Sequence, residues 1–262
     1  MSQNTVILIT GANRGIGLEL VKLYASEPQY TVIAGVRDVT KARELEEWNE
    51  QAGKESGRGG KIHLVKIDAG DLEGNKKAAA EIEQLYGKVD VLWANAGAAC
   101  GSIPVLSATN ADYENLFRTN TLGPIVLFQA FYALLQKSDN PVKKFLITSS
   151  IVGSTGSQHM VPFALSPYGA SKAAVNHVAV KLAQEHGEKD GIAVVCLHPG
   201  SVMSDLGRQG WVDMGLDPDG PLPMPVATPE ECANSLKGVV DGVTVEKDGG
   251  KFIAYDRSVV PW

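Results

Sequence analysis

A tyrosine and a lysine four residues apart carry the strongest chemical signal in the sequence. Tyr168 and Lys172 form a Tyr-Gly-Ala-Ser-Lys segment, and helical residues at i and i+4 share one face. A free tyrosine has a pKa of about 10, and a nearby ammonium favours the phenolate and lowers that pKa. Lowering it by about two or three units brings the phenol into range for acid–base catalysis near neutral pH. A surface tyrosine beside a lysine has the same spacing, so the pair needs support from its surroundings.

Hydroxyl and amide side chains elsewhere in the chain provide that support. Ser150 ends the apolar run that begins at Phe145, where its hydroxyl can hydrogen-bond a substrate oxygen. Asn95 and Gly97 follow another apolar run, and Asn120 lies inside a long helical region, where a polar side chain favours a local break. Simpler interpretations are a cap for Ser150, a turn residue for Asn95 and an exposed helix residue for Asn120.

A glycine-rich turn, Thr10–Gly17, follows the first apolar run and precedes a helical pattern. Glycine permits a tight turn and close approach of the backbone, and a helix N-terminus offers free N–H groups to a pyrophosphate. The spacing is GxxxGxG, which a flexible turn without a ligand also permits. Its position favours a dinucleotide site. The predicted contacts from this turn are Gly11, Asn13, Arg14, Gly15, Ile16 and Gly17.

The end of the second apolar run indicates which dinucleotide binds. NAD sites place an acid there for the ribose 2′-hydroxyl, but Val36 occupies that position. Arg37 follows, Arg14 lies in the glycine turn, and arginine binds phosphate in a bidentate manner. Asp38 argues for NAD(H), and both arginines could be solvated surface charges. The pattern favours NADP(H).

The elements that must position these residues alternate from end to end. Strands are predicted at Thr5–Ile9, Tyr30–Val36, Lys61–Ile67, Val89–Ala94, Lys144–Thr148, Ile192–Leu197 and Lys251–Tyr255. Helices are predicted at Ile16–Ser26, Thr40–Gln51 with Thr40 as its cap, Glu73–Tyr86, Asp112–Lys137 with a kink at Pro124, Tyr168–His186 and Pro229–Val240. Continuous apolar strands between helices indicate an α/β, Rossmann-type doubly wound parallel sheet of about seven strands with helices on both faces.

Two segments are predicted to be irregular. Gly53–Gly60 is expected to be a loop, and Ser201–Val226 a loop that acts as a lid. The lid's apolar residues favour a hydrophobic substrate; they are Met203, Leu206, Trp211, Met214 and Leu216. No linker or break in composition divides the chain, so residues 1–262 are expected to form one domain. Its dinucleotide-binding part covers about 1–150 and its catalytic and substrate-binding part about 150–262.

Composition excludes several other classes. The net charge of −6 gives no indication of a nucleic-acid partner. The three cysteines are far apart, so a zinc site is not expected, and Cys100, near a glycine-rich segment, could line a pocket. No stretch is apolar enough to span a membrane, and the N-terminus does not resemble a signal peptide. A cytoplasmic protein without metal or membrane partner is expected.

Together these motifs resemble the short-chain dehydrogenase/reductase family in its single-domain form. The resemblance covers Thr5 to about Ser204, and the motifs TGxxxGxG, NAG, Asn, Ser, YxxxK and PG occur in the family's order. The segments GANRGIGLEL and HPG are most similar to sniffer-type carbonyl reductases and fungal norsolorinic acid-type ketoreductases. The segment between Ser150 and Tyr168 looks longer than in most members, which affects the expected pocket shape.

The resemblance implies roles for the catalytic residues. Tyr168 would be the general acid in reduction and the base in oxidation, and Lys172 would lower its pKa and bond the nicotinamide ribose. Ser150 would orient the carbonyl, and Asn120 would hold a water that relays protons from Lys172. The resemblance also implies cofactor contacts from Asp68 to the adenine amino group, from Asn95 and Gly97 to the adenosine, and from Pro199, Gly200, Val202 and Ser204 near the nicotinamide.

The expected function is hydride transfer between NADP(H) and a hydrophobic carbonyl or secondary alcohol, aromatic and polyketide-derived compounds included. Epimerisation or dehydration is less favoured because such relatives carry a distinct substrate domain. The alternative is an NADP(H)-binding sensor or regulator without turnover. The apolar helices at Asp112–Lys137 and Tyr168–His186 predict a homodimer or homotetramer, unless all of that surface faces the sheet.

Overall fold

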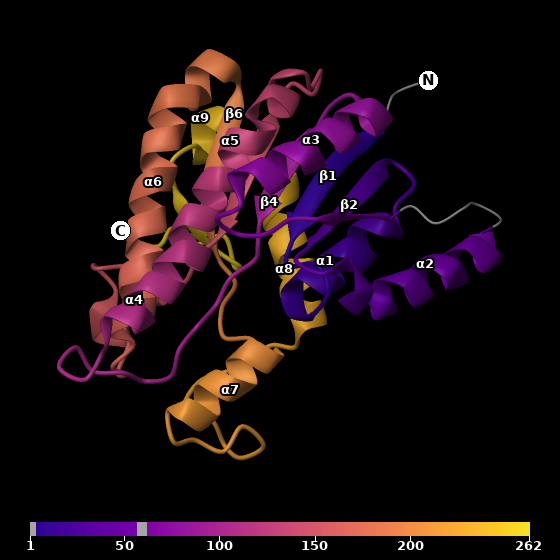
Figure 1. The fold of residues 1–262 in the computed structure, drawn as a ribbon. Coiled ribbons are helices and arrows are strands. Elements are labelled where there is room, and N and C mark those ends of the chain that lie inside the picture. Colours follow the sequence, from indigo (N-terminus) through magenta and orange to yellow (C-terminus); the bar gives the residue numbers. More distant parts are fainter. Residues whose placement is uncertain (1–3, 57–61) are drawn as a thin grey trace.

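Seven strands form one parallel sheet in the computed structural model, which describes residues 4–56 and 62–262 (Figure 1). Their order across the sheet is β3-β2-β1-β4-β5-β6-β7. The strands are β1 (Thr5–Thr10), β2 (Tyr30–Val36), β3 (Ile62–Lys66), β4 (Val91–Ala94), β5 (Lys143–Thr148), β6 (Ile192–His198) and β7 (Phe252–Ala254). The predicted fold class is confirmed.

The central strands are buried on both faces, which explains their continuous apolar sequences. In β1, Ile7 pairs with Val32 of β2 and with Val91 of β4, so the strand lies in the middle of the sheet. Residues Ile192–Leu197 of β6 are all buried. Helices must therefore cover both sides of the sheet.

Helices do cover the sheet as two layers, each with its own apolar core. One layer holds α1 (Gly15–Ala25), α2 (Arg43–Ser56) and α8 (Pro229–Asp241). The other holds α3 (Leu72–Tyr86), α5 (Gly123–Gln136) and α6 (Ser166–Asp190), and α4 (Asn110–Phe117) packs on α6. The short α9 (Val245–Asp248) lies beside β6. In Figure 1, α7 (Asp205–Asp213) stands apart from both layers, beyond the ends of the strands.

The long predicted helix Asp112–Lys137 is divided in two. A π-helical turn, η2 (Arg118–Leu122), separates α4 from α5, and it contains Asn120. The break thus occurs at the polar residue and not as a kink at Pro124, which occupies the first turn of α5, where its missing N–H costs nothing.

Three other boundaries differ from the prediction. Thr40 does not cap α2, because Asp38 caps a short 3₁₀ turn, η1 (Val39–Lys41), and α2 begins at Arg43. The helix continues to Ser56, so the predicted loop at Gly53–Gly60 is wrong for its first four residues, and its last four lie outside the described residues. The lid segment Ser201–Val226 is not all loop, because it contains α7.

Candidate active site

The sheet reverses its winding between β1 and β4, and the ends of these strands are joined by side-chain hydrogen bonds. Thr10 Oγ1 accepts the main-chain N–H groups of Asn95 and Ala96, both at 3.1 Å. Asn95 Nδ2 donates to the Thr10 carbonyl at 3.0 Å. Ligands of doubly wound sheets bind at this switch point, at the carboxyl ends of the strands. The glycine turn and the Asn95–Gly97 segment are thus fixed to each other there.

The glycine turn brings backbone segments closer than any side chain permits. A Cβ on Gly17 would lie 2.3 Å from the Gly11 carbonyl oxygen and 2.6 Å from Asn95 Nδ2. Gly11 has a φ of +65°, and a Cβ there would lie 2.8 Å from the Cα of Ala96. Gly15 also has a positive φ. This is a cradle in which bare backbone faces the site.

The N-terminus of α1 continues this cradle. Arg14 is its N-cap and makes no side-chain capping bond, and the first turn carries no acidic residue. Its free N–H groups and the helix dipole therefore suit a pyrophosphate. Asn13 precedes this cap in the turn, while Ile16 packs on the core below.

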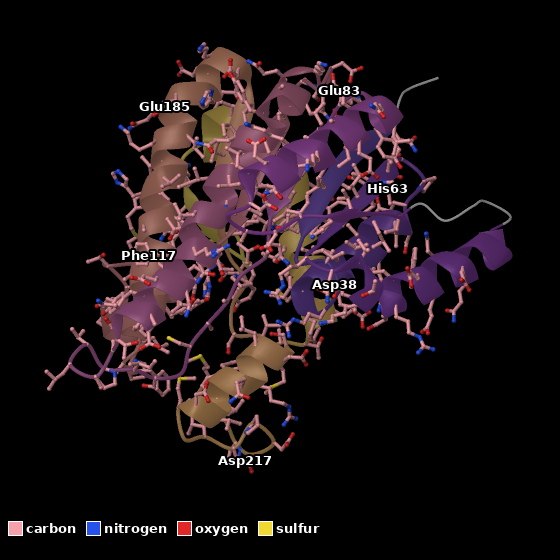
Figure 2. The ribbon with its side chains drawn as sticks, viewed as in Figure 1. Asp38, His63, Glu83, Phe117, Glu185 and Asp217 are labelled. Carbon is pink, nitrogen blue, oxygen red and sulfur yellow. The ribbon has the colours of Figure 1, made fainter. Side chains whose placement is uncertain are left out.

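One exposed arginine lies in the turn, and a second follows the neighbouring strand β2. Arg37 directly follows β2, and Arg14 approaches Asp205 of α7 at 4.0 Å. Asp38 lies at the end of the sheet that faces α7 (Figure 2), where its carboxylate accepts the Thr40 N–H at 3.1 Å and the Thr40 hydroxyl at 2.7 Å. These bonds, foremost the one with the hydroxyl, lower the pKa of Asp38. Asp38 is thus engaged by its own turn.

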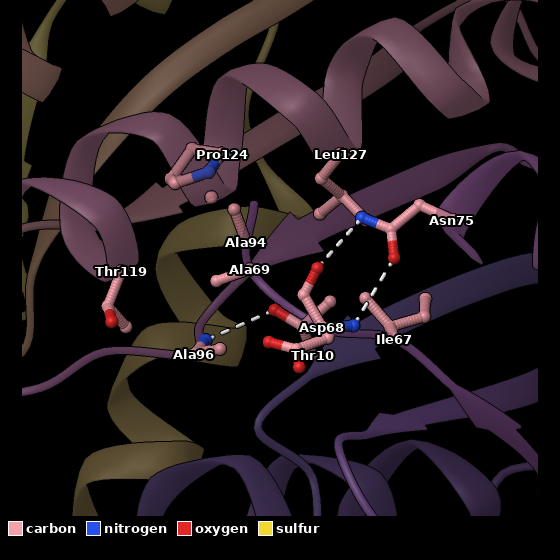
Figure 3. A pocket seen from close by; sticks show the side chains of 11 residues that line it. Thr10, Ile67, Asp68, Ala69, Asn75, Ala94, Ala96, Thr119, Pro124 and Leu127 are labelled. Atoms are coloured by element: carbon pink, nitrogen blue, oxygen red, sulfur yellow. Dashed lines mark hydrogen bonds between the residues drawn. The ribbon is translucent and has the colours of Figure 1, made fainter. Parts of the chain in front are cut away.

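A pocket beside the switch point holds Asp68 (Figure 3). Its cavity volume is only about 30 Å³ and it opens to solvent, with Ile67, Asp68, Ala96, Thr119 and Leu127 among its walls. Asn75 fixes the Asp68 main chain, accepting its N–H and donating to its carbonyl, each at 3.2 Å. Sequence reasoning missed Asn75. The available signal was an asparagine in the buried stripe that Ala78, Ala79 and Ile82 form on α3.

Tyr168 and Lys172 lie on one face of α6, as predicted. The Lys172 ammonium is 5.8 Å from the centre of the Tyr168 ring and donates to the Thr148 carbonyl at 2.8 Å. Ser150 follows β5, and its hydroxyl is a neighbour of the Tyr168 phenol that lowers the pKa of this tyrosine. The Ser150 hydroxyl also accepts the Val152 N–H at 3.3 Å, which caps the 3₁₀ turn η3 (Ile151–Gly153).

Burial sets the protonation of this pair. It raises the pKa of Tyr168, and the Ser150 hydroxyl offsets only part of the effect. The predicted lowering of the Tyr168 pKa by Lys172 is not seen in this structure, where burial raises that pKa and Ser150 is the group that lowers it. Burial also lowers the pKa of Lys172 to about 8. Tyr168 thus holds its proton at neutral pH, while Lys172 can release its own slightly above neutrality.

Asn120 connects the π turn to the strand end and to α6. Its Oδ1 accepts the Ala98 N–H at 2.8 Å, and its Nδ2 donates to the Ala98 carbonyl at 2.8 Å and to Ser171 Oγ at 2.9 Å. Both amide protons are therefore used within the protein. A Cβ on Gly97 would lie 3.4 Å from Asn120 Oδ1 and 3.6 Å from Lys172 Nζ, so both groups border Gly97.

A buried polar chain links the two halves of the site. Trp93 Nε1 donates to Thr148 Oγ1 at 3.0 Å, and this hydroxyl donates to Asn95 Oδ1 at 3.2 Å. The carbonyl of the same Thr148 holds Lys172. Sequence reasoning missed Thr148, whose only signal is a polar residue next to Ser149 and Ser150 at the end of an apolar strand.

The segment after β6 returns over the glycine turn. Gly200 follows Pro199 with a φ of +80°, and Val202 pairs with Ala227 and is buried in the core. Ser204 caps α7, and its Cβ would be 3.3 Å from a Cβ on Gly15. This course brings the segment alongside the turn that forms the phosphate cradle.

Helix α7 packs on the loop after β4 and on the segment that precedes Tyr168. Trp211 of α7 is buried and meets the Phe163 ring edge-to-face at 6.2 Å. A Cβ on Gly101 would lie 2.8 Å from the Asp213 Cβ, so α7 also packs on the loop after β4. Cys100 in that loop is half-buried beside the Tyr168 main chain, and it is not among the residues that line the pocket of Figure 3.

Within 4–56 and 62–262, no group of three or more His, Cys, Asp or Glu side chains could hold a metal ion. In the same ranges, no helix is long and apolar enough to cross a membrane.

Comparisons of the sequence and of the structure with known proteins both find short-chain dehydrogenases and carbonyl reductases. A family model described as short chain dehydrogenase matches residues 5–213. The short-chain dehydrogenase RED3 of Pyricularia oryzae is 35% identical over 269 residues, which cover 100% of both chains. The chain is similar in structure to the NADPH-bound carbonyl reductase from chicken fatty liver (TM-score 0.84, 26% identity) and to the carbonyl reductase Sniffer of D. melanogaster (TM-score 0.82, 28% identity), each covering 100% of both chains.

Proposed function

The chain belongs to the short-chain dehydrogenase family of oxidoreductases, and from this premise we propose that it reduces hydrophobic ketones or aldehydes with NADPH and oxidises the matching alcohols in reverse. One observation carries the proposal: Tyr168, Ser150 and Lys172 are assembled at the carboxyl end of the sheet, beside a glycine cradle. A phenol, a hydroxyl and an ammonium grouped in this way suit proton transfer to a carbonyl oxygen.

The cradle and its surroundings fit a nicotinamide dinucleotide. The N–H groups at the start of α1 would hold the pyrophosphate, and Gly11, Gly15 and Gly17 would let it approach the backbone closely. Asp68 in the pocket of Figure 3 would accept from the adenine amino group. The Pro199–Ser204 segment, which lies over the turn, would border the nicotinamide.

Arg14 and Arg37 support NADP(H) over NAD(H). Both guanidinium groups are exposed at the end of β2 and the start of α1, where a 2′-phosphate would lie. The acid that could instead bond a 2′-hydroxyl, Asp38, already accepts two hydrogen bonds from Thr40. The NADPH in the chicken carbonyl reductase agrees with this preference.

The protein's part in the reaction is positioning and proton transfer. When bound, the cofactor supplies the hydride for the carbonyl carbon. Ser150 would orient the carbonyl oxygen, and Tyr168 would donate its proton to that oxygen as negative charge develops there. Lys172 would return a proton to Tyr168. Acid catalysis of this kind contributes about 10²–10⁴ in rate. A raised pKa keeps the phenol protonated, which favours the reducing direction.

The lid supports a hydrophobic substrate. Trp211 and Phe163 form an aromatic contact above the site, and Met203, Met214 and Leu216 are half-buried around α7. The charged Arg208 of α7 is exposed and pairs with Asp219 at 2.5 Å. A sugar or a charged metabolite would leave its polar groups unpaired against such a surface.

The direct test replaces Tyr168 with phenylalanine. The variant Tyr168→Phe should lose carbonyl reduction while it still quenches or enhances NADPH fluorescence, because it removes only the acid. Retention of full turnover would contradict the proposed role. Binding of NADPH without turnover by the unaltered chain, over a broad panel of aromatic and aliphatic carbonyls, would instead indicate a sensor or regulator.

Assembly and location complete the proposal. The exposed Leu122 and the half-buried apolar residues of α5 and α6 support a homodimer or homotetramer. Light scattering of the purified protein tests this, and a monomer would contradict it. Three free cysteines support a reducing, cytoplasmic environment. Imaging of the tagged chain tests the location.

A further inference from the structure

His198, the last residue of β6, lies between the catalytic serine and the turn that follows the strand. Its Nδ1 is 3.4 Å from the main-chain nitrogen of Ile151 and 3.4 Å from that of Gly200, and both N–H groups donate to it. Ile151 directly follows Ser150. One nitrogen atom therefore contacts the segments on both sides of the proposed hydride-transfer site.

This nitrogen continues the sheet where its backbone ladder ends. Thr148 of β5 pairs with Leu197 of β6, and the Ser149 N–H still donates to the Leu197 carbonyl at 2.8 Å. Beyond that point the two chains diverge, one into η3 and the other into the Pro199–Gly200 turn. Here His198 Nδ1, and not a backbone carbonyl, accepts the Ile151 N–H on one side and the Gly200 N–H on the other.

The surroundings fix the ring and its tautomer. Because Nδ1 accepts two N–H groups, the proton of the neutral ring resides on Nε2. Burial lowers the pKa of His198 to about 4, and Asp256 is the charged group that opposes this effect. The ring meets Tyr255 edge-to-face at 6.4 Å, and the Tyr255 N–H donates to the His198 carbonyl at 2.9 Å. The imidazole is thus neutral at physiological pH and held from both sides.

We infer that His198 is a positioning residue, which through Nδ1 sets the Ser150 turn relative to the Pro199–Gly200 turn and so aligns the substrate carbonyl with the cofactor. The inference rests on the proposed function. Ser150 is sensitive to this contact because its own hydroxyl accepts the Val152 N–H from the same η3 turn. A shift of η3 would therefore move the hydroxyl that orients the carbonyl.

Two variants separate this role from a structural one. His198→Leu keeps the volume but removes the acceptor, whereas in His198→Asn the amide oxygen takes the place of Nδ1. His177→Leu, at an exposed position on α6, is the matched control. Circular dichroism and thermal melting establish that each variant is folded before kinetics are compared.

The expected result is a kcat in His198→Leu that is lower by about tenfold to a hundredfold, since small misplacements at a reacting centre have effects of this size. The KM for the carbonyl should change little, and the Kd for NADPH should rise modestly because Gly200 loses its anchor. His198→Asn should recover most of the lost kcat. Equal kcat in the leucine variant and the unaltered chain, or equal losses in both variants, would overturn the inference.

A spectroscopic measurement keeps the inference separate from the proposed function. Long-range ¹⁵N–¹H spectra of the full chain at pH 7 should show His198 with an unprotonated Nδ1 and a protonated Nε2, whether or not a carbonyl substrate has been found. A protonated Nδ1 would overturn the inference. If the unaltered chain reduces no carbonyl but the tautomer is as expected, the failure belongs to the proposed function.

Discussion

The side-chain amide of Asn120 binds the main chain of Ala98 in both directions, accepting its N–H and donating to its carbonyl, each at 2.8 Å. This pairing joins the π turn between α4 and α5 to the loop after β4. The π turn exists where the amide must reach that loop, which gives the break in the long helix a physical cause.

Replacing Asn120 with alanine should destabilise the protein and impair the site. The change leaves both main-chain groups of Ala98 without their partner, which costs about 1–3 kcal/mol in the free energy of unfolding. Thermal or denaturant unfolding measures the loss. Asn115→Ala, at an exposed position on α4, is the matched control and should be nearly neutral. Equal stability of the two variants would refute the importance of the pairing.

Gly17→Ala should reduce both stability and cofactor binding. The added Cβ would collide with the Gly11 carbonyl oxygen at 2.3 Å, and forcing atoms into such a space costs about 1–3 kcal/mol. Gly238→Ala on α8 meets no atom within 4 Å and should instead stabilise the chain by up to about 1 kcal/mol. Unfolding curves and NADPH titration compare the two. A Gly17→Ala chain that binds NADPH normally would contradict the close approach.

Arg37→Ala should weaken NADPH binding by about tenfold to a hundredfold, since a charge-assisted hydrogen bond contributes about 1.5–3 kcal/mol. NADH binding should not change, because NADH lacks the 2′-phosphate. Fluorescence titrations with both cofactors give the two dissociation constants. Arg43→Ala, where the arginine pairs with Glu47 on the surface of α2, controls for loss of one positive charge. Parallel loss of NADH affinity would indicate that Arg37 has another role.

The rate of carbonyl reduction should fall as the pH rises through about 8. Burial lowers the pKa of Lys172 to about 8, so above that pH the ammonium group that returns a proton to Tyr168 is lost. The rate of alcohol oxidation should rise over the same range, because the neutral amine can accept a proton. The same shift affects stability. An unfolded lysine keeps its proton up to its ordinary pKa of 10.5, so the free energy of unfolding should increase between about pH 8 and 10.5. Lys172→Met should abolish both dependences; a pH profile unchanged in that variant would contradict them.

The sheet could be predicted from sequence because strands that are buried on both faces are continuous apolar runs. Ile7, Val32 and Val91 are neighbours in the sheet, and each lies in an apolar run that the sequence displays. The glycine cradle was predictable for a similar reason, since close backbone approach at Gly17 excludes any other residue. The break at Asn120 agrees with the expectation that its polar side chain favours a local break in the helix.

Other features depend on contacts between distant segments, which local patterns do not record. Helix α7 lies in a stretch rich in glycine and aspartate, and it is stabilised by the Ser204 cap and by the packing of Trp211 against Phe163. The pKa of Tyr168 is another case. The sequence displays the neighbouring lysine, but it does not display the burial that raises the pKa of the tyrosine. The role of Asp38 was open for the same reason, because its bonds to Thr40 decide it.

The most direct measurement of the central claim is a titration of the purified chain with NADPH and with NADH, followed by nicotinamide fluorescence, and then addition of aromatic ketones, quinones and aldehydes. We predict tight binding of NADPH, weak binding of NADH, and oxidation of the bound NADPH when a hydrophobic carbonyl is added. Preferential binding of NADH would show that Asp38, and not Arg37, governs the ribose. Absence of binding by either cofactor would contradict the account as a whole.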